Sequence, residues 1–320
     1  DIATELLSDM LQNSLLRESD IEMERRVILE EIKQTWDDPA SLIHGLYTEN
    51  IWRGNPAAHP IGGTLETISK MPIEDIRGYY EEKYAGDLVV VAAGAVDHEA
   101  LVSSIDNLHQ KGRGKCAKDR SRPVYYPGKK YVERETGQVQ LSITTPGYPY
   151  GGEDAPVQSI IMSYLGLGAS SLLFQEVREK RGLVYNIYAY NQSLSDVGAF
   201  SVFAGTSKGN LEEVVKITLD EFEGMKQGLD PETLETVKHK TIGLFILGSE
   251  SNRQRMRHLG VSILRAGEPR SVEYVVSRLE AVTNEDIMRV AEKMFDSNKI
   301  AFTALGVSEA EAMGLESLIR

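Results

Sequence analysis

The sequence predicts an α+β protein of two homologous α/β units, the first of them incomplete at its N-terminus. Helical patterns, with apolar residues three and four apart, alternate with short apolar runs that are typical of buried strands. A block near the N-terminus also recurs near the C-terminus with its elements in the same order. At 320 residues the chain is long enough for two domains that each have a core.

The elements of the first unit are expected to be mainly helical. Ser19 followed by Glu22 forms a capping box, Pro39 ends one helix and opens the next, and Asp97 caps a later one. We therefore expect helices over residues 1–16, 19–36, 39–52, 72–84 and 97–109, and a buried strand at 88–96.

The second unit follows a segment that is rich in glycine, proline and basic residues. We assign residues 1–115 to the C-terminal part of the first domain, 116–130 to a linker and 131–320 to the second domain. The second domain is expected to contain strands at 138–145, 184–190, 199–204 and 300–307, and helices at 155–165, 172–181, 211–227, 231–247 and 251–266.

The repeat relates the two units residue by residue. Glu-Asp-Ile at 74–76 recurs at 285–287, 211 positions later, and each copy leads into an apolar strand. Farther upstream the offset is 213, which pairs Glu24 with Val237 and Glu31 with Leu244. Only the first copy therefore keeps two carboxylates, as expected of a duplicated fold with one working site, although a lost salt bridge would leave the same asymmetry.

Glu24 and Glu31 are the candidate functional residues of the helix at 19–36. They are seven residues apart, so their side chains lie within about 20° of each other around the helix axis. Read locally, they belong to a solvated face neutralised by the arginines and lysine of the same helix. The alternative is a metal-binding or catalytic role, since a carboxylate at the edge of an apolar stripe needs a partner.

Composition excludes some function classes. Lys and Arg number 35 against 48 Asp and Glu, a net charge of −13, which argues against a nucleic-acid partner. The single cysteine, Cys116, excludes an internal disulfide framework. No apolar run reaches membrane-spanning length.

Gly166–Ser171 lacks the lysine of a phosphate-binding loop, so we expect a tight turn there. Because the sequence starts inside a helical pattern, we expect it to be part of a longer protein.

Three stretches together resemble the pitrilysin/insulinase zinc metallopeptidases, in the branch of bacterial processing-type peptidases and the mitochondrial processing peptidase. They are Leu6–Glu31, Ala92–Glu99 and, most specifically, Leu173–Tyr185 (Leu-Phe-Gln-Glu-Val-Arg-Glu-Lys-Arg-Gly-Leu-Val-Tyr). The match covers nearly the whole chain and implies antiparallel-rich sheets flanked by helices, with a metal-side first domain and a substrate-side second domain.

The resemblance implies a zinc ion held by a His-x-x-Glu-His motif and a downstream glutamate. That glutamate falls on Glu31, and a supporting glutamate falls on Glu24. Such a site leaves a coordination position for water, whose pKa the metal lowers. No His-x-x-Glu-His occurs in this sequence, so the two histidine ligands and the general-base glutamate are absent from it. His44 and His59 are poor substitutes because the segment after His44 is irregular.

Arg178 and Tyr185 match the pair that the family's second half contributes to substrate binding and oxyanion stabilisation. The local alternatives are that Arg178 pairs with Glu176 or Glu179 and that Tyr185 is a core residue.

The resemblance implies a zinc endopeptidase that closes two halves over a short or unfolded peptide, which adds as a strand to a sheet edge. This chain, without the histidine motif, is expected to be inactive and not to retain zinc. Expected partners are a peptide substrate and a homologous chain in a homodimer or heterodimer. The alternatives are a non-catalytic partner subunit, which the retained glutamates and the short 166–171 segment disfavour, and a peptide-binding module. A bacterial cytoplasmic location is expected, with the mitochondrial matrix as the alternative.

Overall fold

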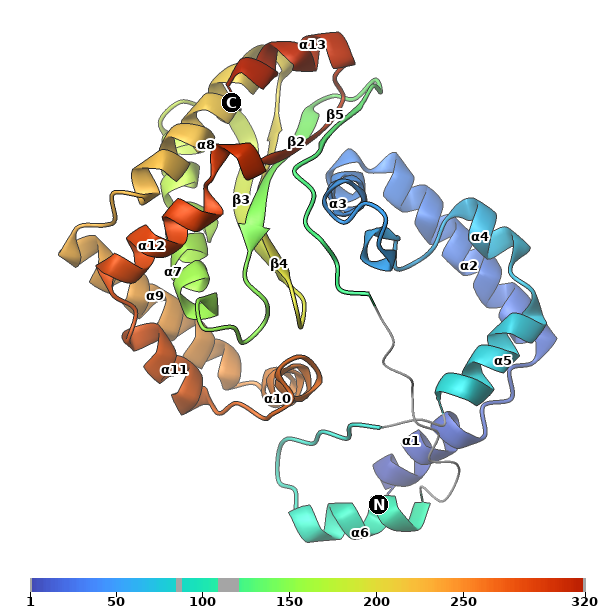
Figure 1. Ribbon diagram of the computed structural model, residues 1–320. Coiled ribbons are helices and arrows are strands. Elements are labelled where there is room, and N and C mark those ends of the chain that lie inside the picture. Colours follow the sequence, from blue (N-terminus) through green and yellow to red (C-terminus); the bar gives the residue numbers. More distant parts are fainter. Residues whose placement is uncertain (1, 85–87, 109–120, 319–320) are drawn as a thin grey trace.

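The computed structural model describes residues 2–84, 88–108 and 121–318. The described residues contain a five-stranded sheet with helices on both faces, and an arm of helices from the N-terminal third of the chain (Figure 1). The predicted α+β class is confirmed. Cys116 and residues 117–120 of the predicted linker lie outside the described residues.

The elements of the first unit are all helical in the described residues. They are α1 (Ile2–Gln12), α2 (Glu18–Asp37), α3 (Pro39–Ile51), α4 (Leu65–Lys70), α5 (Ile73–Lys83) and α6 (His98–Leu108), with the short 3-10 helix η1 (Pro56–Ala58). The sequence predicted these helices to within a few residues, apart from η1 and α4.

The second unit contains five strands and more helices. The strands are β1 (Lys129–Val132), β2 (Val139–Gly147), β3 (Val184–Ser193), β4 (Gly198–Thr206) and β5 (Ala301–Leu305). The α-helices are α7 (Ala155–Gly166), α8 (Leu211–Met225), α9 (Pro231–Ser249), α10 (Asn252–Ala266), α11 (Val272–Glu280), α12 (Asn284–Met294) and α13 (Glu309–Met313). Shorter turns are the π-helix η2 (Phe174–Glu179) and the 3-10 helices η3 (Lys208–Asn210), η4 (Ser297–Lys299) and η5 (Gly314–Ser317). The sequence missed β1, α11 and α13.

The strand order is β1-β5-β2-β4-β3. Only β1 and β5 pair in parallel, and the other three pairs are antiparallel, as the resemblance implied. Strand β4 is buried along its whole length because helices cover both faces of the sheet. Its neighbour β2 contributes buried hydroxyls that bond within the sheet, and Thr144 Oγ1 lies 2.9 Å from Ser201 Oγ. These pairings satisfy polar groups that would be costly to bury alone.

The main core lies on the face of the sheet covered by α7, α8 and α12 (Figure 1). Phe222 of α8 and Phe295, directly after α12, stack with ring centroids 4.3 Å apart, and both pack edge-on against Phe200 of β4. Large aromatic side chains that are fully buried in this way contribute strongly to the stability of a core.

Helix α3 of the first unit covers the opposite face of the same sheet (Figure 1). Its apolar side packs against β4 and β5, and Phe203 contacts Tyr47 at a centroid distance of 5.0 Å. Buried Asn50 donates through Nδ2 to Gly128 O at 2.9 Å, to Phe302 O at 3.2 Å and to Thr303 Oγ1 at 3.1 Å. Helix α3 is therefore part of the core that surrounds the second unit's sheet.

The helix boundaries reproduce the repeat. Helices α2 and α9 begin 213 positions apart, and so do α3 and α10. Helices α5 and α12 begin 211 positions apart, as do α6 and α13. The two offsets that relate the sequences of the units therefore also relate the first residues of their helices.

The predicted capping box at Ser19 is wrong. Helix α2 begins one residue earlier, at Glu18, and its N-cap is Arg17 with an extended backbone and no side-chain cap. Ser19 consequently lies inside the first turn, where its hydroxyl donates to Asp20 Oδ1 at 3.3 Å. The extended backbone of Arg17, set by the turn from α1, decides the start of the helix.

The predicted buried strand at 88–96 is also wrong in this structure. The segment has no regular secondary structure, and Leu88 and Val90 are 46% and 48% exposed. An apolar run becomes a strand only where another strand supplies ladder hydrogen bonds, and no strand among the described residues pairs with it. The segment lies instead against α10, since a Cβ on Gly260 would be 3.4 Å from Val91 Cγ2.

Candidate functional site

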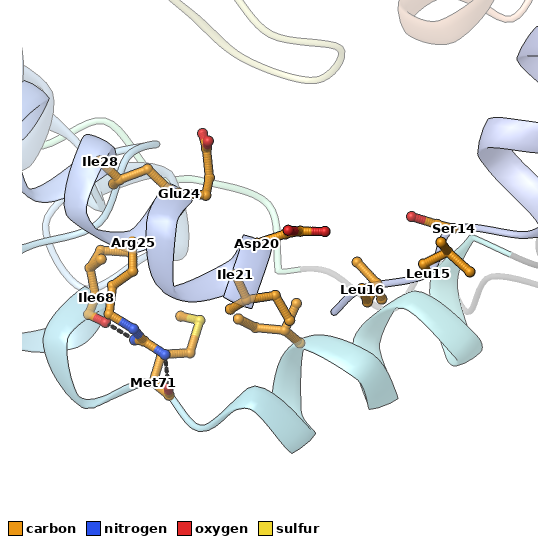
Figure 2. A pocket seen from close by; sticks show the side chains of 11 residues that line it. Ser14, Leu15, Leu16, Asp20, Ile21, Glu24, Arg25, Ile28, Ile68 and Met71 are labelled. Atoms are coloured by element: carbon orange, nitrogen blue, oxygen red, sulfur yellow. Dashed lines mark hydrogen bonds between the residues drawn. The ribbon is translucent and has the colours of Figure 1, made fainter. Parts of the chain in front are cut away.

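Helix α2 positions the two candidate glutamates, and Arg25 fixes that helix to its neighbours. The Arg25 guanidinium donates to the carbonyl oxygen of Ile68 and, at 2.7 Å, to that of Met71. Figure 2 shows these bonds, with the Glu24 side chain pointing away from the guanidinium. Because Arg25 joins α2 to the end of α4, the direction of the glutamates is set by the packing of these helices.

The acidic residues beside the candidates take the cations of the helix. Glu22 accepts from Arg25 at 3.1 Å, and Glu30 accepts from Lys33 at 2.7 Å. Neither Glu24 nor Glu31 forms an ion pair or a side-chain hydrogen bond within the described part of the chain, and both are exposed. Both carboxylates are solvated, as the local interpretation expects, but no cation of the helix pairs with either of them in the described residues.

Each glutamate lines a different cavity. Glu24 belongs to a cavity of about 590 Å³ between α2, the turn before it and residues 68–76. Glu31 belongs to a cavity of about 630 Å³ between α2, α3 and residues 60–66. The second cavity also contains Glu49, which Lys130 pairs at 2.6 Å, and Glu66, which Lys70 pairs at 2.8 Å. Of the three carboxylates that line this cavity, Glu31 is therefore the one without a cation beside it in the described residues.

The residues present do not make a complete zinc site. Across residues 2–84, 88–108 and 121–318, no three histidine, cysteine, aspartate or glutamate side chains are grouped so as to hold a metal. His44 lies on α3 with Nε2 2.9 Å from the Tyr188 hydroxyl, and its ring centroid is 4.4 Å from that of Phe203. Burial lowers the pKa of this imidazole. His59 lines a separate cavity.

Arg178 and Tyr185 are brought together by η2 and the start of β3. The guanidinium carbon of Arg178 lies 4.6 Å from the Phe174 ring centroid and 5.9 Å from that of Tyr185. Both distances are those of cation–π contacts. Tyr185 is 73% exposed, so the alternative that it is a core residue is wrong.

The predicted local ion pair of Arg178 is also wrong. Glu176 instead accepts from Lys180 and, at 2.7 Å, from Arg181. These hydrogen bonds lower the pKa of the Glu176 carboxyl. Arg178 has no acidic partner and no side-chain hydrogen bond among the described residues, so its donors are available to a ligand.

The turn at 166–171 is held by interactions that the sequence did not predict. Lys240 of α9 donates to Leu167 O at 2.6 Å and to Ser163 O at 3.2 Å, and Ser171 Oγ donates to Gly168 O at 2.7 Å. A Cβ on Gly166 would lie 2.2 Å from the backbone nitrogen of Ala189, so only glycine fits there. The expected tight turn is present, and it leads directly into η2. A lone lysine in a helix gave no signal of this role.

Glu24 and Glu31 lie on α2 of the N-terminal arm, whereas Arg178 and Tyr185 lie on η2 and β3 of the second unit. Among those residues, no helix is long and apolar enough to span a membrane.

Comparison with known proteins identifies the family. A family model described as "Peptidase M16 inactive domain" matches residues 70–241, and one described as "Insulinase (Peptidase family M16)" matches residues 1–65. An uncharacterized zinc protease of Streptomyces coelicolor is 34% identical over 303 residues, which cover 91% of this chain and 66% of that protein. An uncharacterized zinc protease of Mycobacterium tuberculosis is 32% identical, and the match covers 95% of this chain and 71% of that protein. An uncharacterized zinc protease of Bacillus subtilis is 27% identical, with 92% of this chain and 72% of that protein covered. The chain therefore spans about two thirds of the length of these relatives.

Solved structures share the fold. The peptidase M16 inactive domain from Pseudomonas fluorescens superimposes with a TM-score of 0.82 at 18% identity, covering 96% of this chain and 74% of that one. A protease from Helicobacter pylori gives 0.81 at 17% identity, with 95% and 76% covered. A chain of complex III2 from Candida albicans gives 0.86 at 15% identity, with 99% and 79% covered. The family-model matches and the relatives at 32% and 34% identity show that the chain belongs to the insulinase (M16) peptidase family.

Proposed function

We propose that this chain is part of a zinc endopeptidase that cleaves short or unfolded peptides, and that Arg178 and Tyr185 bind the substrate. The observation that carries the proposal is the state of Arg178. Its guanidinium is always charged, has no acidic partner in the described residues and lies against two aromatic rings. Such a group is suited to hydrogen-bonding a peptide carbonyl, and the exposed Tyr185 hydroxyl is suited to the same task.

The substrate is proposed to be an extended peptide. Strand β3 pairs with β4 on one side, and on its other side no described strand pairs with it. Tyr185 lies at the beginning of this edge strand. A peptide that adds to such an edge must expose its backbone, which folded proteins do not. This supports short or unfolded peptides as the substrate class.

Glu31 is proposed as one zinc ligand and Glu24 as a supporting residue. The support is that both carboxylates lack cations among the described residues, while their neighbours Glu22 and Glu30 have them. Since the described residues provide no three-ligand cluster, the remaining ligands would come from outside the described residues. The zinc-protease names of the bacterial relatives support zinc for the family.

A non-catalytic partner subunit is the second candidate. It is favoured by the name of the family model over residues 70–241, "Peptidase M16 inactive domain", and by the shared fold of a complex III2 chain. In either case we propose a homologous second chain as partner, in a homodimer or heterodimer. Because the relatives are bacterial, we favour a bacterial cytoplasmic location over the mitochondrial matrix.

The test uses the natural full-length protein and a quenched fluorescent peptide with no stable structure. We expect hydrolysis that a zinc chelator stops and added zinc restores, and no cleavage of a folded domain carrying the same sequence. Absence of hydrolysis by the zinc-loaded protein across a library of unstructured peptides would contradict the endopeptidase and favour the partner subunit.

A further inference from the structure

The repeat places a second cavity at the position equivalent to that of Glu31. Helices α9 and α10 repeat α2 and α3 with an offset of 213. Along α2, the cavity of Glu31 is lined by residues 28, 31, 32, 35 and 36. Of the residues 213 positions later, 244, 245, 248 and 249 line a cavity of about 330 Å³ between α9, α10 and Tyr150, and 241 does not. The two cavities therefore share equivalent positions on α2 and α9, whereas on α3 and α10 the only equivalent pair among their described lining residues is Gly45 and His258.

The counterpart cavity has the opposite charge. Where the first repeat presents Glu31, the second presents Leu244, and α10 adds Arg257 and Arg265 to the lining. Helix α10 contains four arginines and no aspartate or glutamate, in a chain whose net charge is −13. A site that has lost its carboxylate and gained two guanidinium groups is suited to an anion.

The two arginines keep donors free for a ligand. The Arg257 side chain forms no ion pair and no hydrogen bond within the described part of the chain. Arg265 donates one hydrogen bond, from Nη1 to Ser193 O at 2.7 Å, and its guanidinium lies 5.9 Å from the Tyr150 ring centroid. Neither arginine has an acidic partner among the described residues. The cavity thus has two positive groups without internal neutralisation.

Part of the remaining lining is apolar. Leu244, Phe245 and Val261 provide aliphatic and aromatic surface. His258 packs edge-on against Phe245 at a centroid distance of 5.3 Å, and its Nε2 lies 2.8 Å from Arg270 O, which fixes this wall. At about 330 Å³ the cavity is at the small end of ligand sites, so a single residue or small molecule matches it.

We propose that this cavity binds the C-terminal residue of a peptide, with the carboxylate on Arg257 and Arg265 and an apolar side chain against Leu244, Phe245 and Val261. A guanidinium group matches the planar carboxylate, and the apolar wall gives the attached side chain a place that a free phosphate would not use. That the bound molecule is a peptide rests on the proposed function. That it carries a carboxylate is inferred from the residues of the cavity itself.

The test measures binding of fluorescent peptides to the natural full-length protein, kept free of metal so that no peptide is cut. One peptide ends in leucine with a free carboxylate, the second carries a C-terminal amide, and the third carries the amide and an internal glutamate. We expect the free acid to bind at least about tenfold more tightly than either amide, the effect of one charge-assisted hydrogen bond. Arg257→Gln and Arg265→Gln should remove this difference, and Arg253→Gln, on the same helix outside the cavity, should keep it.

A second pair of variants uses the repeat. Leu244→Glu restores the carboxylate of the first repeat. It should weaken binding of the peptide with a free C-terminal carboxylate at least tenfold more than Leu244→Gln does, because only the glutamate neutralises the arginines. Because the assay needs neither zinc nor turnover, a failed endopeptidase assay does not affect its outcome.

Three results would overturn the proposal. They are equal affinity for acid and amide ends, equal losses with Arg253→Gln and Arg257→Gln, and an internal glutamate that fully replaces the terminal carboxylate. Inorganic phosphate can also be used as a competitor of peptides that differ in their last side chain. If it displaced all of these peptides equally well, the apolar part of the assignment would be overturned.

Discussion

The guanidinium carbon of Arg178 lies 5.9 Å from the centroid of the Tyr185 ring. Two residues seven positions apart thus meet although one lies on η2 and the other on β3. The tight turn at 181–183 between these elements brings them together, and Gly182 adopts a positive φ of 64° there.

We predict that Tyr185→Phe lowers kcat of the full-length enzyme about tenfold or more, since it removes the hydroxyl and keeps the ring beside Arg178. Steady-state kinetics on an unstructured peptide provide the measurement. Tyr190→Phe, also an exposed tyrosine of β3, is the matched control and should leave kcat unchanged. Equal effects of the two substitutions would remove the Tyr185 hydroxyl from the mechanism.

Glu31→Gln should abolish zinc retention by the natural full-length protein, because an amide is a much poorer ligand for zinc than a carboxylate. Metal content after dialysis, measured by mass spectrometry, tests this. Glu30→Gln is the control, since Glu30 is paired with Lys33 on the same helix. Normal zinc content in Glu31→Gln would exclude this residue as a ligand.

Asn50→Ala should lower the free energy of unfolding by about 2 kcal/mol, because it removes the buried amide that donates to Gly128 O, Phe302 O and Thr303 Oγ1. Urea unfolding followed by circular dichroism measures this change. Asn13→Ala removes a comparable amide from an exposed position, where it donates to Asp9 Oδ1 at 2.8 Å, and should cost less than about 1 kcal/mol. Similar losses in both variants would mean that the Asn50 network contributes little.

Acidification should destabilise the wild-type protein through His44. Burial lowers the pKa of its imidazole below the ordinary 6.5, so the unfolded chain takes up the proton more readily than the folded one. The stabilisation is complete above pH 6.5 and is lost as pH falls through the lowered pKa. His44→Phe keeps a ring beside Phe203 and should therefore show a smaller decrease in melting temperature between pH 7.5 and pH 5. An unchanged decrease would show that His44 does not titrate in this range.

The helix boundaries could be predicted because local signals set them. Pro39 opens α3, and Asp97 caps α6 by accepting from the backbone of Ala100 at 2.8 Å. Ser19 failed as a signal because the backbone of Arg17, one residue before the helix, is extended and starts it earlier. Side-chain chemistry predicts a cap only where the backbone conformation allows it.

The remaining errors concern long-range contacts. The run at 88–96 has the composition of a buried strand, but pairing needs a partner strand, and none of the described strands lies beside it. The position of α3 on the second unit's sheet could not be predicted either, since its apolar side does not specify which sheet it covers.

The candidate site was predicted from resemblance, and local sequence favoured the wrong partners. Glu176 is near Arg178 in sequence, but Lys180 and Arg181 occupy its carboxylate. Which of several neighbouring cations pairs with an acid depends on side-chain directions that spacing does not determine. The cationic cavity on α10 was missed because its arginines are separated in sequence from Leu244 and Tyr150.

Arg178→Gln in the zinc-loaded full-length enzyme tests the proposed role of this chain most directly. We expect kcat/KM for an unstructured peptide to fall about 100-fold, with zinc content and melting temperature unchanged, because the substitution removes the charged donor for the substrate carbonyl. Lys180→Gln removes the same charge two residues away and should leave kcat/KM within about twofold of the wild type. An unchanged kcat/KM in Arg178→Gln would contradict the assignment of Arg178 to substrate binding.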